Sequence, residues 1–283
     1  MTELLDALLA AGIDEVPIVY LDVETTGLHP ELGDRVVEIG ALRCEGDEVL
    51  DAMQQLVNPQ RRIGRGALAV HGITADMVAD APPFAQLATD VLGLLSGAIF
   101  VGHNAPFDLG FLAQEFASAG IGMPPMIALC TLRLSRRVYR LPSHSLANVT
   151  EALGIDVVGE THRAFTDVLL TKALFERISD TMWRQGIRTV RDYVTQQGGP
   201  IQMTSSLPME VPEAIREALA DRCLLALRYR AQSGTETQRI VRPYRVVRRG
   251  GKLLLQGHCL LRDEERTFRI DRIIEIDVVD ELA

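Results

Sequence analysis

The stretch Ile18-Val-Tyr-Leu-Asp-Val-Glu-Thr-Thr-Gly27 decides the fold of the first part of the chain. Its run of apolar and β-branched residues is typical of a buried strand, and its Thr-Thr-Gly end is typical of a turn. Asp22 and Glu24 are two positions apart, so both carboxylates project from the same face of that strand. Two anions beside a core are costly without a cation, and oxygen ligands of this type suit Mg²⁺ or Mn²⁺. On its own, however, the pattern fits a solvated edge strand better than a metal site.

The composition is that of a globular protein with room for two domains. The 283 residues are 47% hydrophobic and 24% charged. No apolar run approaches the ~20 residues that a membrane-spanning helix needs, so we expect no membrane partner. Residues 1–10 carry acids and lack the basic start of a signal peptide. The cysteines form no C-x-x-C pair, which favours reduced thiols and a cytoplasmic location over disulfides or a zinc site. They are Cys44, Cys130, Cys223 and Cys259.

The charge is divided unevenly along the chain. The net charge is −9, but residues 1–207 hold 15 basic and 25 acidic side chains, whereas residues 208–283 hold 14 and 13. Residues 228–252 carry eight basic side chains and a single acid. A basic segment of this kind favours contact with phosphates. The acidic first part is compatible with a nuclease, because bound metal ions cancel several carboxylates.

Further strands and helices are predicted after the opening strand. Two strands, over 35–43 and 48–58, are joined by a Gly-Asp turn and continue an antiparallel start. The predicted elements that follow are a helix over 84–95, a strand over 98–102, a helix to 119, a strand over 126–130, a helix over 145–153 and a helix over 162–182. This order predicts an α/β domain with a mixed sheet.

The domain boundaries are predicted from changes in composition. We expect a first domain over residues 1–183, a linker over 184–207 and a second domain over 208–283. The Gln-Gln-Gly-Gly-Pro sequence at 196–200 is typical of a linker. After it, short strands broken by glycine-containing turns predict a small antiparallel barrel or sheet.

Three acidic motifs follow one another in the first domain. They are D-V-E-T-T-G from Asp22, G-H-N-A-P-F-D ending at Asp108, and H-R-A-F-T-D from His162 to Asp167. Each lies at the end of an apolar element, and an α/β sheet collects its ligands at the carboxyl ends of its strands. Together the motifs resemble those of the DEDDh exonucleases, the ribonuclease H-like family of the proofreading ε subunit of bacterial DNA polymerase III. The resemblance covers residues 16–180 and implies a ribonuclease H-like mixed sheet flanked by helices.

The resemblance implies a site for two divalent ions, Mg²⁺ or Mn²⁺, that supports phosphodiester hydrolysis. Asp22 would bridge the two ions, Glu24 and Asp167 would complete one site, and Asp108 would hold the second. His162 would be the general base, because the unperturbed pKa of histidine lies close to the working pH. Alternatively, His162 only caps a helix or fills a core pocket.

The resemblance also suggests a pocket for the 3′-terminal nucleotide beside the metal ions. The backbone N–H groups of Thr25 and Thr26, together with Leu28, could hold that nucleotide. His71, in the segment H-G-I-T, and Asn104 are further candidates for substrate contact. His71 could equally be a structural histidine, and His103 and Asn104 could instead satisfy backbone groups in the turn before the helix.

The basic second domain carries three recognisable segments: R-I-V-R-P-Y at 239–244, G-K-L-L-L-Q-G-H-C at 251–259, and F-R-I-D-R-I at 268–273. Over residues 211–280 they resemble a WYL domain, which implies an SH3/Sm-like barrel that binds nucleic acid or a nucleotide-like ligand through arginines. The namesake Trp-Tyr-Leu is replaced here by leucines 253–255. Alternatively, the arginines are only the solvated surface of the barrel. The matching arginines are Arg242, Arg266, Arg269 and Arg272.

These observations predict a metal-dependent 3′→5′ exonuclease with a basic accessory domain. DNA is the expected substrate, and single-stranded ends are favoured because a terminal nucleotide must unstack to enter a pocket. An RNA exonuclease on the same fold is an alternative, since the sequence does not reveal recognition of a 2′-hydroxyl. A ligand-sensing regulator with an inactive nuclease domain is a second alternative, although the complete acidic set argues against it. A polymerase or DNA-repair protein is a further possible partner.

Overall fold

The computed structural model describes residues 2–156, 163–201, 211–232, 234–250 and 252–279. Grouped by the proximity of their Cα atoms, the residues form two compact units. The first consists of Met1–Thr26, Arg35–Ile63 and Val70–Leu207, and the second of Gly27–Asp34, Gly64–Ala69 and Pro208–Ala283. In the described parts of the chain, no helix is long and apolar enough to cross a membrane.

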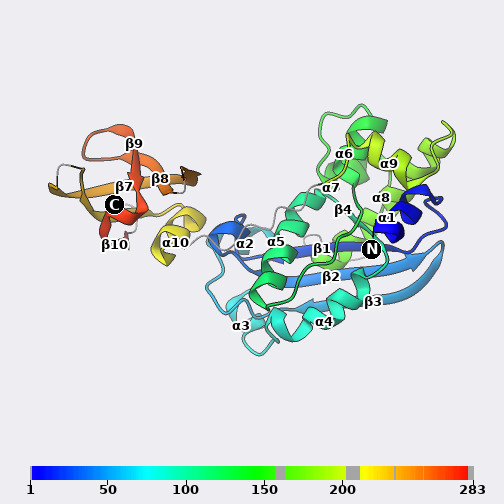
Figure 1. Ribbon diagram of the computed structural model, residues 1–283, viewed down its shortest axis with the longest axis horizontal. Coiled ribbons are helices and arrows are strands. Elements are labelled where there is room, and N and C mark those ends of the chain that lie inside the picture. The colour runs from blue at the N-terminus through cyan, green and yellow to red at the C-terminus, as the bar shows by residue number, and fades with distance from the viewer. Residues whose placement is uncertain (1, 157–162, 202–210, 233, 251, 280–283) are drawn as a thin grey trace. The chain divides into compact units, whose positions relative to one another are not determined.

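The first unit is built on a mixed five-stranded sheet (Figure 1). Its strands are β1 (Ile18–Thr25), β2 (Val36–Glu45), β3 (Glu48–Leu56), β4 (Ile99–Gly102) and β5 (Ala128–Cys130). They lie in the order β3-β2-β1-β4-β5. β1 and β3 both pair antiparallel with β2, whereas β4 pairs in parallel with both β1 and β5. The mixed sheet with an antiparallel start is therefore confirmed.

Helices flank this sheet. They are α1 (Thr2–Ala10), α4 (Phe84–Leu95), α5 (Ala105–Ser118), α6 (Thr131–Val138), α7 (Leu146–Ala152), α8 (Ala164–Trp183) and α9 (Val190–Gln196). The periodicity predicted four of them, α4, α5, α7 and α8, but not α6. Three short helices lie between β1 and α4 in the sequence: η1 (Pro30–Leu32), α2 (Arg65–His71) and α3 (Ala75–Val78).

The alternation of side chains along β1 divides the first unit into two cores. Val19, Leu21 and Val23 point into the core shared with α4 and α5. Ile18 and Tyr20 point into the opposite core, which is shared with α8 and α9. Side chains along a strand alternate between its faces. The two acids that continue the second set are therefore directed toward the α8 side of the sheet.

Part of the predicted linker is packed into the first unit. Val190 and Tyr193 of α9 are completely buried in the α8 core. The side-chain amide of Gln197 donates to the carbonyl of Ala128, and its oxygen accepts a hydrogen bond from the backbone N–H of Cys130, both at 2.9 Å. These residues thus belong to the first unit, although they lie inside the segment predicted as a linker over 184–207. The domain boundaries at 183 and 208 remain predictions.

The second unit is a helix followed by a five-stranded antiparallel sheet (Figure 1). Its elements are α10 (Glu213–Asp221), β6 (Leu224–Arg230), β7 (Glu236–Arg249), β8 (Lys252–Cys259), β9 (Glu264–Arg269), η2 (Ile270–Arg272) and β10 (Ile273–Val279). The strands lie in the order β10-β6-β7-β8-β9. One face of the sheet carries a small core with Leu225, Val241, Leu255 and Phe268.

The sheet of the second unit curls strongly. β6 and β9 are not neighbours in the strand order, yet the Tyr229 hydroxyl accepts a hydrogen bond from the backbone N–H of Arg269 at 3.3 Å. The rings of Tyr229 and Phe268 also meet edge to face, 5.2 Å apart. At Gly257 the backbones approach so closely that a Cβ atom would lie 2.5 Å from the carbonyl oxygen of Arg242. The antiparallel architecture predicted for this part of the chain is thus confirmed.

Candidate metal centre and nuclease site

Three carboxylates from two elements come together on the α8 face of the sheet. Asp22 and Glu24 project from β1, and Asp167 lies in the first turn of α8. One oxygen from each residue lies within 4.8 Å of the others. A divalent ion that contacts oxygen ligands at about 2.1 Å can lie between atoms at this separation. The half-buried cluster therefore has the dimensions of a cation site.

A glycine on β2 allows α8 to reach this cluster. Gly40 pairs with Asp22 across the β1–β2 ladder, so both positions face the same side. A Cβ atom at Gly40 would lie 2.5 Å from the carbonyl carbon of Ala164 and 2.6 Å from the backbone nitrogen of Phe165. Only a residue without a side chain lets the start of α8 lie directly on the strand. No local sequence pattern marks this position.

Asp108 lies in the first turn of α5, which begins shortly after β4 ends. Its side chain is buried, and Oδ1 accepts a hydrogen bond from the backbone N–H of Val23 at 3.2 Å. This bond joins Asp108 to the strand that carries Asp22 and Glu24. The second oxygen, Oδ2, is buried and has no hydrogen-bond donor among the described residues. A buried carboxylate oxygen is costly to leave unsatisfied, and a metal ion would satisfy it.

The electrostatics of the site also fit a divalent cation. Burial, with repulsion from Asp108, Asp167 and Glu24, raises the pKa of Asp22 well above its usual range. Burial raises the pKa of Asp108 to about 8, with Asp167 adding to the effect. The pKa of Glu24 also rises to about 8 through burial and then the charge of Asp167. Hard oxygen ligands that are crowded and partly desolvated match the chemistry of Mg²⁺ or Mn²⁺.

An ion pair with a fully buried carboxylate lies beside the cluster, and no local sequence pattern marks it. Glu38 on β2 is completely buried and binds Arg163, the residue before α8, with Nη2 at 2.7 Å from Oε1. Arg163 is itself the second residue of the H-R-A-F-T-D motif. The pairing depends on the register between β1 and β2, which no local sequence pattern reveals.

The turn after β1 is held by hydrogen bonds on two sides. The backbone N–H of Ile73 donates to Nδ1 of His71 at 2.9 Å, so Nε2 carries the proton and donates to the carbonyl of Thr25 at 3.1 Å. The backbone N–H of Thr26 donates to the carbonyl of Arg35 at 2.8 Å, and the Thr26 hydroxyl accepts from the Arg35 N–H at 3.0 Å. The Thr26 amide thus already has an acceptor within the protein, and its contact with a nucleotide remains a prediction. His71 braces this turn, and its contact with substrate remains a prediction.

The other predicted substrate residues have different outcomes. Leu28 is 72% exposed, as a residue that meets a ligand can be. Asn104 is exposed in the left-handed conformation, with φ 71°, and makes no capping hydrogen bond, so it does not satisfy the turn before α5. His162 lies outside the described residues, and its role as general base remains a prediction.

His103 performs the bracing that Asn104 does not. Its ring lies within hydrogen-bonding distance of the Thr131 hydroxyl, at 2.9 Å from Nδ1, and of the His144 carbonyl, at 3.0 Å from Nε2. Burial lowers the pKa of His103 to about 4. The ring is therefore neutral at physiological pH and joins the end of β4 to α6 and to the segment before α7.

In the second unit, local acids bind several of the predicted arginines. Arg269 forms a bidentate pair with Asp271, and Arg266 pairs with Glu264. Arg242 is exposed, and Arg272 is half-buried on η2. These contacts weaken the view that every arginine of the domain is available to phosphates. They do not test the predicted role in binding.

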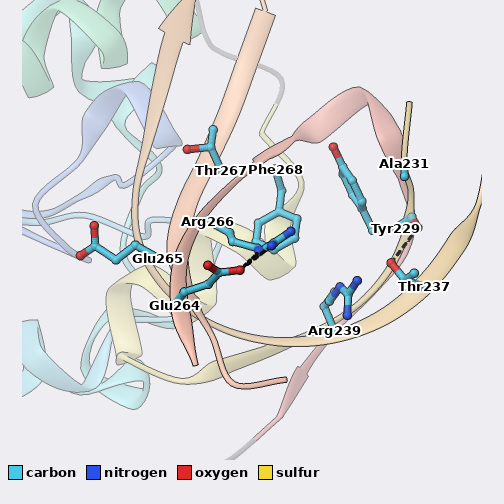
Figure 2. A pocket seen from close by; sticks show the side chains of 9 residues that line it. All are labelled: Tyr229, Ala231, Thr237, Arg239, Glu264, Glu265, Arg266, Thr267 and Phe268. Atoms are coloured by element: carbon cyan, nitrogen blue, oxygen red, sulfur yellow. Dashed lines mark hydrogen bonds and ion pairs between the residues drawn. The ribbon is translucent and has the colours of Figure 1, made fainter. Parts of the chain in front are cut away.

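A cavity of about 350 Å³ lies on the inner side of the curled sheet (Figure 2). Arg239 of β7 and Arg266 of β9 point into the same space beside the ring of Tyr229, whereas Glu265 and Thr267 point away from it (Figure 2). Two arginines and two carboxylates, from Glu264 and Glu265, line this cavity, and Glu264 pairs with Arg266.

A mixed sheet with an antiparallel start, carboxylates from β1 and α8 that meet on one of its faces, and a buried α5 carboxylate hydrogen-bonded to β1 define the ribonuclease H-like class of metal-dependent nuclease folds. A family model described as exonuclease matches residues 19–175, and one described as WYL domain matches residues 210–278. The chain therefore belongs to the exonuclease family and carries a WYL domain after the exonuclease part.

Comparison with individual proteins agrees with this assignment. The chain is 37% identical over 194 residues to a DNA polymerase III subunit epsilon-like protein of Rhodobacter capsulatus, covering 67% of this chain and 27% of the relative. It is 34% identical over 165 residues to the 3′-5′ exonuclease DinG of Bacillus subtilis, covering 58% of this chain and 18% of the relative. The chain thus spans about a quarter or less of these relatives.

A solved structure shows the same fold. Exonuclease X in complex with 5′ overhanging duplex DNA is 28% identical, with a TM-score of 0.50, and the match covers 64% of this chain and 99% of that one. The nuclease domain of 3′hExo, described as a DEDDh family member bound to rAMP, has a TM-score of 0.50 at 22% identity, covering 62% of this chain and 96% of that one. These matches confirm the ribonuclease H-like fold class.

Proposed function

We propose that this protein is a 3′→5′ exonuclease that removes nucleotides from DNA ends with the help of two divalent ions, Mg²⁺ or Mn²⁺. The observation that carries the proposal is the cluster of Asp22, Glu24 and Asp167, whose oxygens lie within 4.8 Å of one another. The unsatisfied oxygen of Asp108 supports it. Membership of the exonuclease family and the similarity to DinG point to the same reaction.

Each residue of the site has a distinct part in this proposal. When bound, divalent ions would supply a nucleophile at neutral pH and stabilise negative charge on the attacked phosphate. Asp22, Glu24 and Asp167 would hold one ion, with Asp22 shared between both ions, and Asp108 would hold the second. His162 would take the proton of the attacking water, because a histidine can be neutral near pH 7 and still accept a proton.

The proposed substrate is the 3′ end of single-stranded DNA. A terminal nucleotide has to leave its stack before its phosphodiester bond can reach carboxylates on a half-buried strand face. The solved structure of Exonuclease X contains DNA, which supports the same polymer here. A contact to the 2′-hydroxyl would instead make RNA the preferred substrate, so the experiment has to compare DNA with RNA.

We further propose that the second unit contacts nucleic acid or a regulatory ligand through its arginines. The cavity lined by Arg239 and Arg266 beside Tyr229 supports this, because it combines cationic groups with an aromatic ring. A polymerase or repair partner is also proposed, on the grounds that one similar protein is named as an epsilon-like polymerase subunit.

One time course tests activity, direction and sugar preference together. DNA and RNA strands labelled at either the 3′ or the 5′ end are incubated with the protein and Mg²⁺ or Mn²⁺. We expect immediate release of labelled mononucleotide from 3′-labelled DNA and a ladder of shortened products from 5′-labelled DNA. Asp22→Asn should abolish both, whereas Asp90→Asn, an exposed acid on α4, should abolish neither. Cleavage that persists in Asp22→Asn, or that needs no divalent ion, would disprove the proposed site.

A further inference from the structure

We propose that the buried ion pair between Glu38 and Arg163 is a positioning device that sets the first turn of α8, and with it Asp167, against β1. This inference rests on the proposed function, because it concerns the same metal site. It gives a role to Glu38 and Arg163, which are not among the predicted metal ligands. Neither residue is proposed to touch the metal ions or the substrate.

The contacts use every acceptor position that Glu38 offers toward α8. Nε of Arg163 lies 3.2 Å from Oε1 and 3.1 Å from Oε2 of Glu38, and Nη2 lies 2.7 Å from Oε1. The backbone N–H of Ala164 donates to Oε2 at 3.1 Å. The Glu38 side chain is 1% exposed and the Arg163 side chain 27% exposed, so the carboxylate end of the pair is shielded from water. A charge-assisted bidentate pair of this kind fixes orientation as well as distance.

Glu38 supplies the N-terminal cap that α8 lacks locally. Arg163 is the N-cap residue of α8, and its side chain makes no capping hydrogen bond. The first backbone N–H groups of a helix need outside acceptors, normally a Ser, Thr, Asp or Asn at the N-cap. Here the acceptor comes from β2, 126 positions earlier in the sequence. The start of the helix is thereby attached to the sheet.

This attachment lies one turn from the metal site. The backbone N–H of Asp167 donates to the carbonyl of Arg163 at 3.1 Å, so both residues belong to the same helical turn. Glu38 also lies directly opposite Glu24 in the β1–β2 ladder. A shift of Arg163 would therefore move Asp167 relative to Glu24, and the carboxylates would no longer converge on one ion.

The same register explains why the partner is an arginine. Like charges that face each other across a strand pair are destabilising, and Glu24 and Glu38 would be such a pair. Arg163 neutralises Glu38 and thereby reduces this repulsion. Arg163 therefore both positions the start of α8 and neutralises Glu38. The experiment has to separate these two effects.

The test measures Mn²⁺ binding by titration calorimetry without any substrate, alongside kcat, KM and Tm. The variants are Arg163→Met, Arg163→Lys and the double variant Glu38→Gln with Arg163→Met, which carries no buried charge and therefore remains foldable if the single variant does not. The matched control is Arg35→Met. Arg35 forms a pair of the same kind with Glu115, at 2.8 and 2.7 Å, and Glu115 also accepts from the N–H of Val36 at 3.0 Å.

If the pair positions Asp167, the single and the double variant with Arg163→Met should both bind Mn²⁺ on the order of tenfold more weakly and lose kcat with little change in KM. Arg163→Lys should recover part of the affinity, and Arg35→Met should lower Tm without a comparable loss. Full affinity in the double variant would overturn the inference, since charge alone would then matter. An equal loss of affinity in Arg35→Met would also overturn it. A wild-type protein that binds Mn²⁺ but does not cut DNA would instead refute the proposed function.

Discussion

Gly40 lies directly opposite Asp22 in the β1–β2 ladder, and a Cβ atom at Gly40 would lie 2.5 Å from the carbonyl carbon of Ala164 at the start of α8. We expect Gly40→Ala to lift α8 from the sheet, because the atoms that it meets belong to the backbone and cannot turn aside. The unfolding free energy should fall by about 1–3 kcal/mol, the usual range for overpacking. Denaturant unfolding and Mn²⁺ titration would measure both consequences.

Gly93 is the control for this substitution. It lies in α4, is exposed, and an added Cβ atom would meet nothing within 4 Å. Gly93→Ala should therefore stabilise the protein by about 0.5–1 kcal/mol, as expected for alanine in a helix. If Gly40→Ala were as stable as Gly93→Ala, the close packing of α8 on β2 would be wrong.

Replacing a member of the acidic cluster should stabilise the protein in the absence of metal. Asp22→Asn and Asp167→Asn each remove one anion from a crowded group, so Tm without metal should hold or rise while hydrolysis is lost. Addition of Mn²⁺ should raise the Tm of the wild type and leave both variants nearly unchanged, because a ligand stabilises only the state that binds it. Hydrolysis that survives in either variant would remove that residue from the metal site.

His162→Ala should separate chemistry from binding. If His162 is the general base, its loss should lower kcat by about 10²–10⁴ while the affinities for Mn²⁺ and DNA persist. Calorimetry and single-turnover rates would distinguish the two effects. A collapse of metal or DNA affinity together with the rate would assign His162 a structural or ligand role.

His103 should make the protein sensitive to acid. Burial lowers its pKa in the folded protein to about 4, below the 6.5 of an ordinary histidine. The unfolded chain therefore binds more protons between these values, and the contribution of His103 to stability is lost as the pH falls from about 6.5 toward 4. The slope can reach about 1.4 kcal/mol per pH unit. Urea midpoints between pH 7 and pH 5 should vary less in His103→Asn.

His29 is a useful comparison for that experiment. A hydrogen bond to Glu31 raises the pKa of His29, so its contribution has the opposite sign and is lost as the pH rises through the folded value. His29→Asn should thus leave the acid sensitivity of the protein intact. Equal pH profiles for the wild type and His103→Asn would show that His103 is not the group responsible.

The salt dependence of DNA binding tests the second unit. With catalysis blocked by Asp22→Asn, the Kd for a long single strand is measured against salt concentration in the full chain. If Arg239 binds phosphate, replacing it with Gln should flatten the slope by ~0.7 for every phosphate that is no longer neutralised, whereas Arg266, which Glu264 already binds, should contribute less. Arg228 is the control, because Glu236 and Glu275 already bind its guanidinium. Slopes that do not change would leave a small ligand or a protein as the partner of this unit.

The sequence predicted those parts of the site that depend on local periodicity. Alternation along a strand was sufficient to place Asp22 and Glu24 on one face, and the motif order was sufficient to bring Asp167 to them. Gly40 and Glu38 were missed because their importance comes from the register between β1 and β2. That register is set by pairing over many residues and is not written in either strand alone.

The turn after β1 is a second place where local sequence does not reveal a tertiary contact. A Thr-Thr-Gly sequence correctly marked the end of the strand, and its amides were expected to face a nucleotide. Arg35, nine positions after Thr26, instead occupies the Thr26 amide and hydroxyl. Whether a backbone group is free depends on its tertiary partners, which propensity and spacing do not reveal.

The acidic cluster joins residues that are far apart in the sequence and are therefore synthesised at different times. Asp22 is among the first residues of the fold, whereas Asp167 and its anchor Arg163 appear only after the strands β1 to β5 have been made. Contacts of such long sequence separation form late in folding. A growing chain therefore carries no complete metal centre until α8 has left the ribosome and docked on β2. On the proposed function, cleavage of nucleic acid would therefore not begin before α8 has docked on β2.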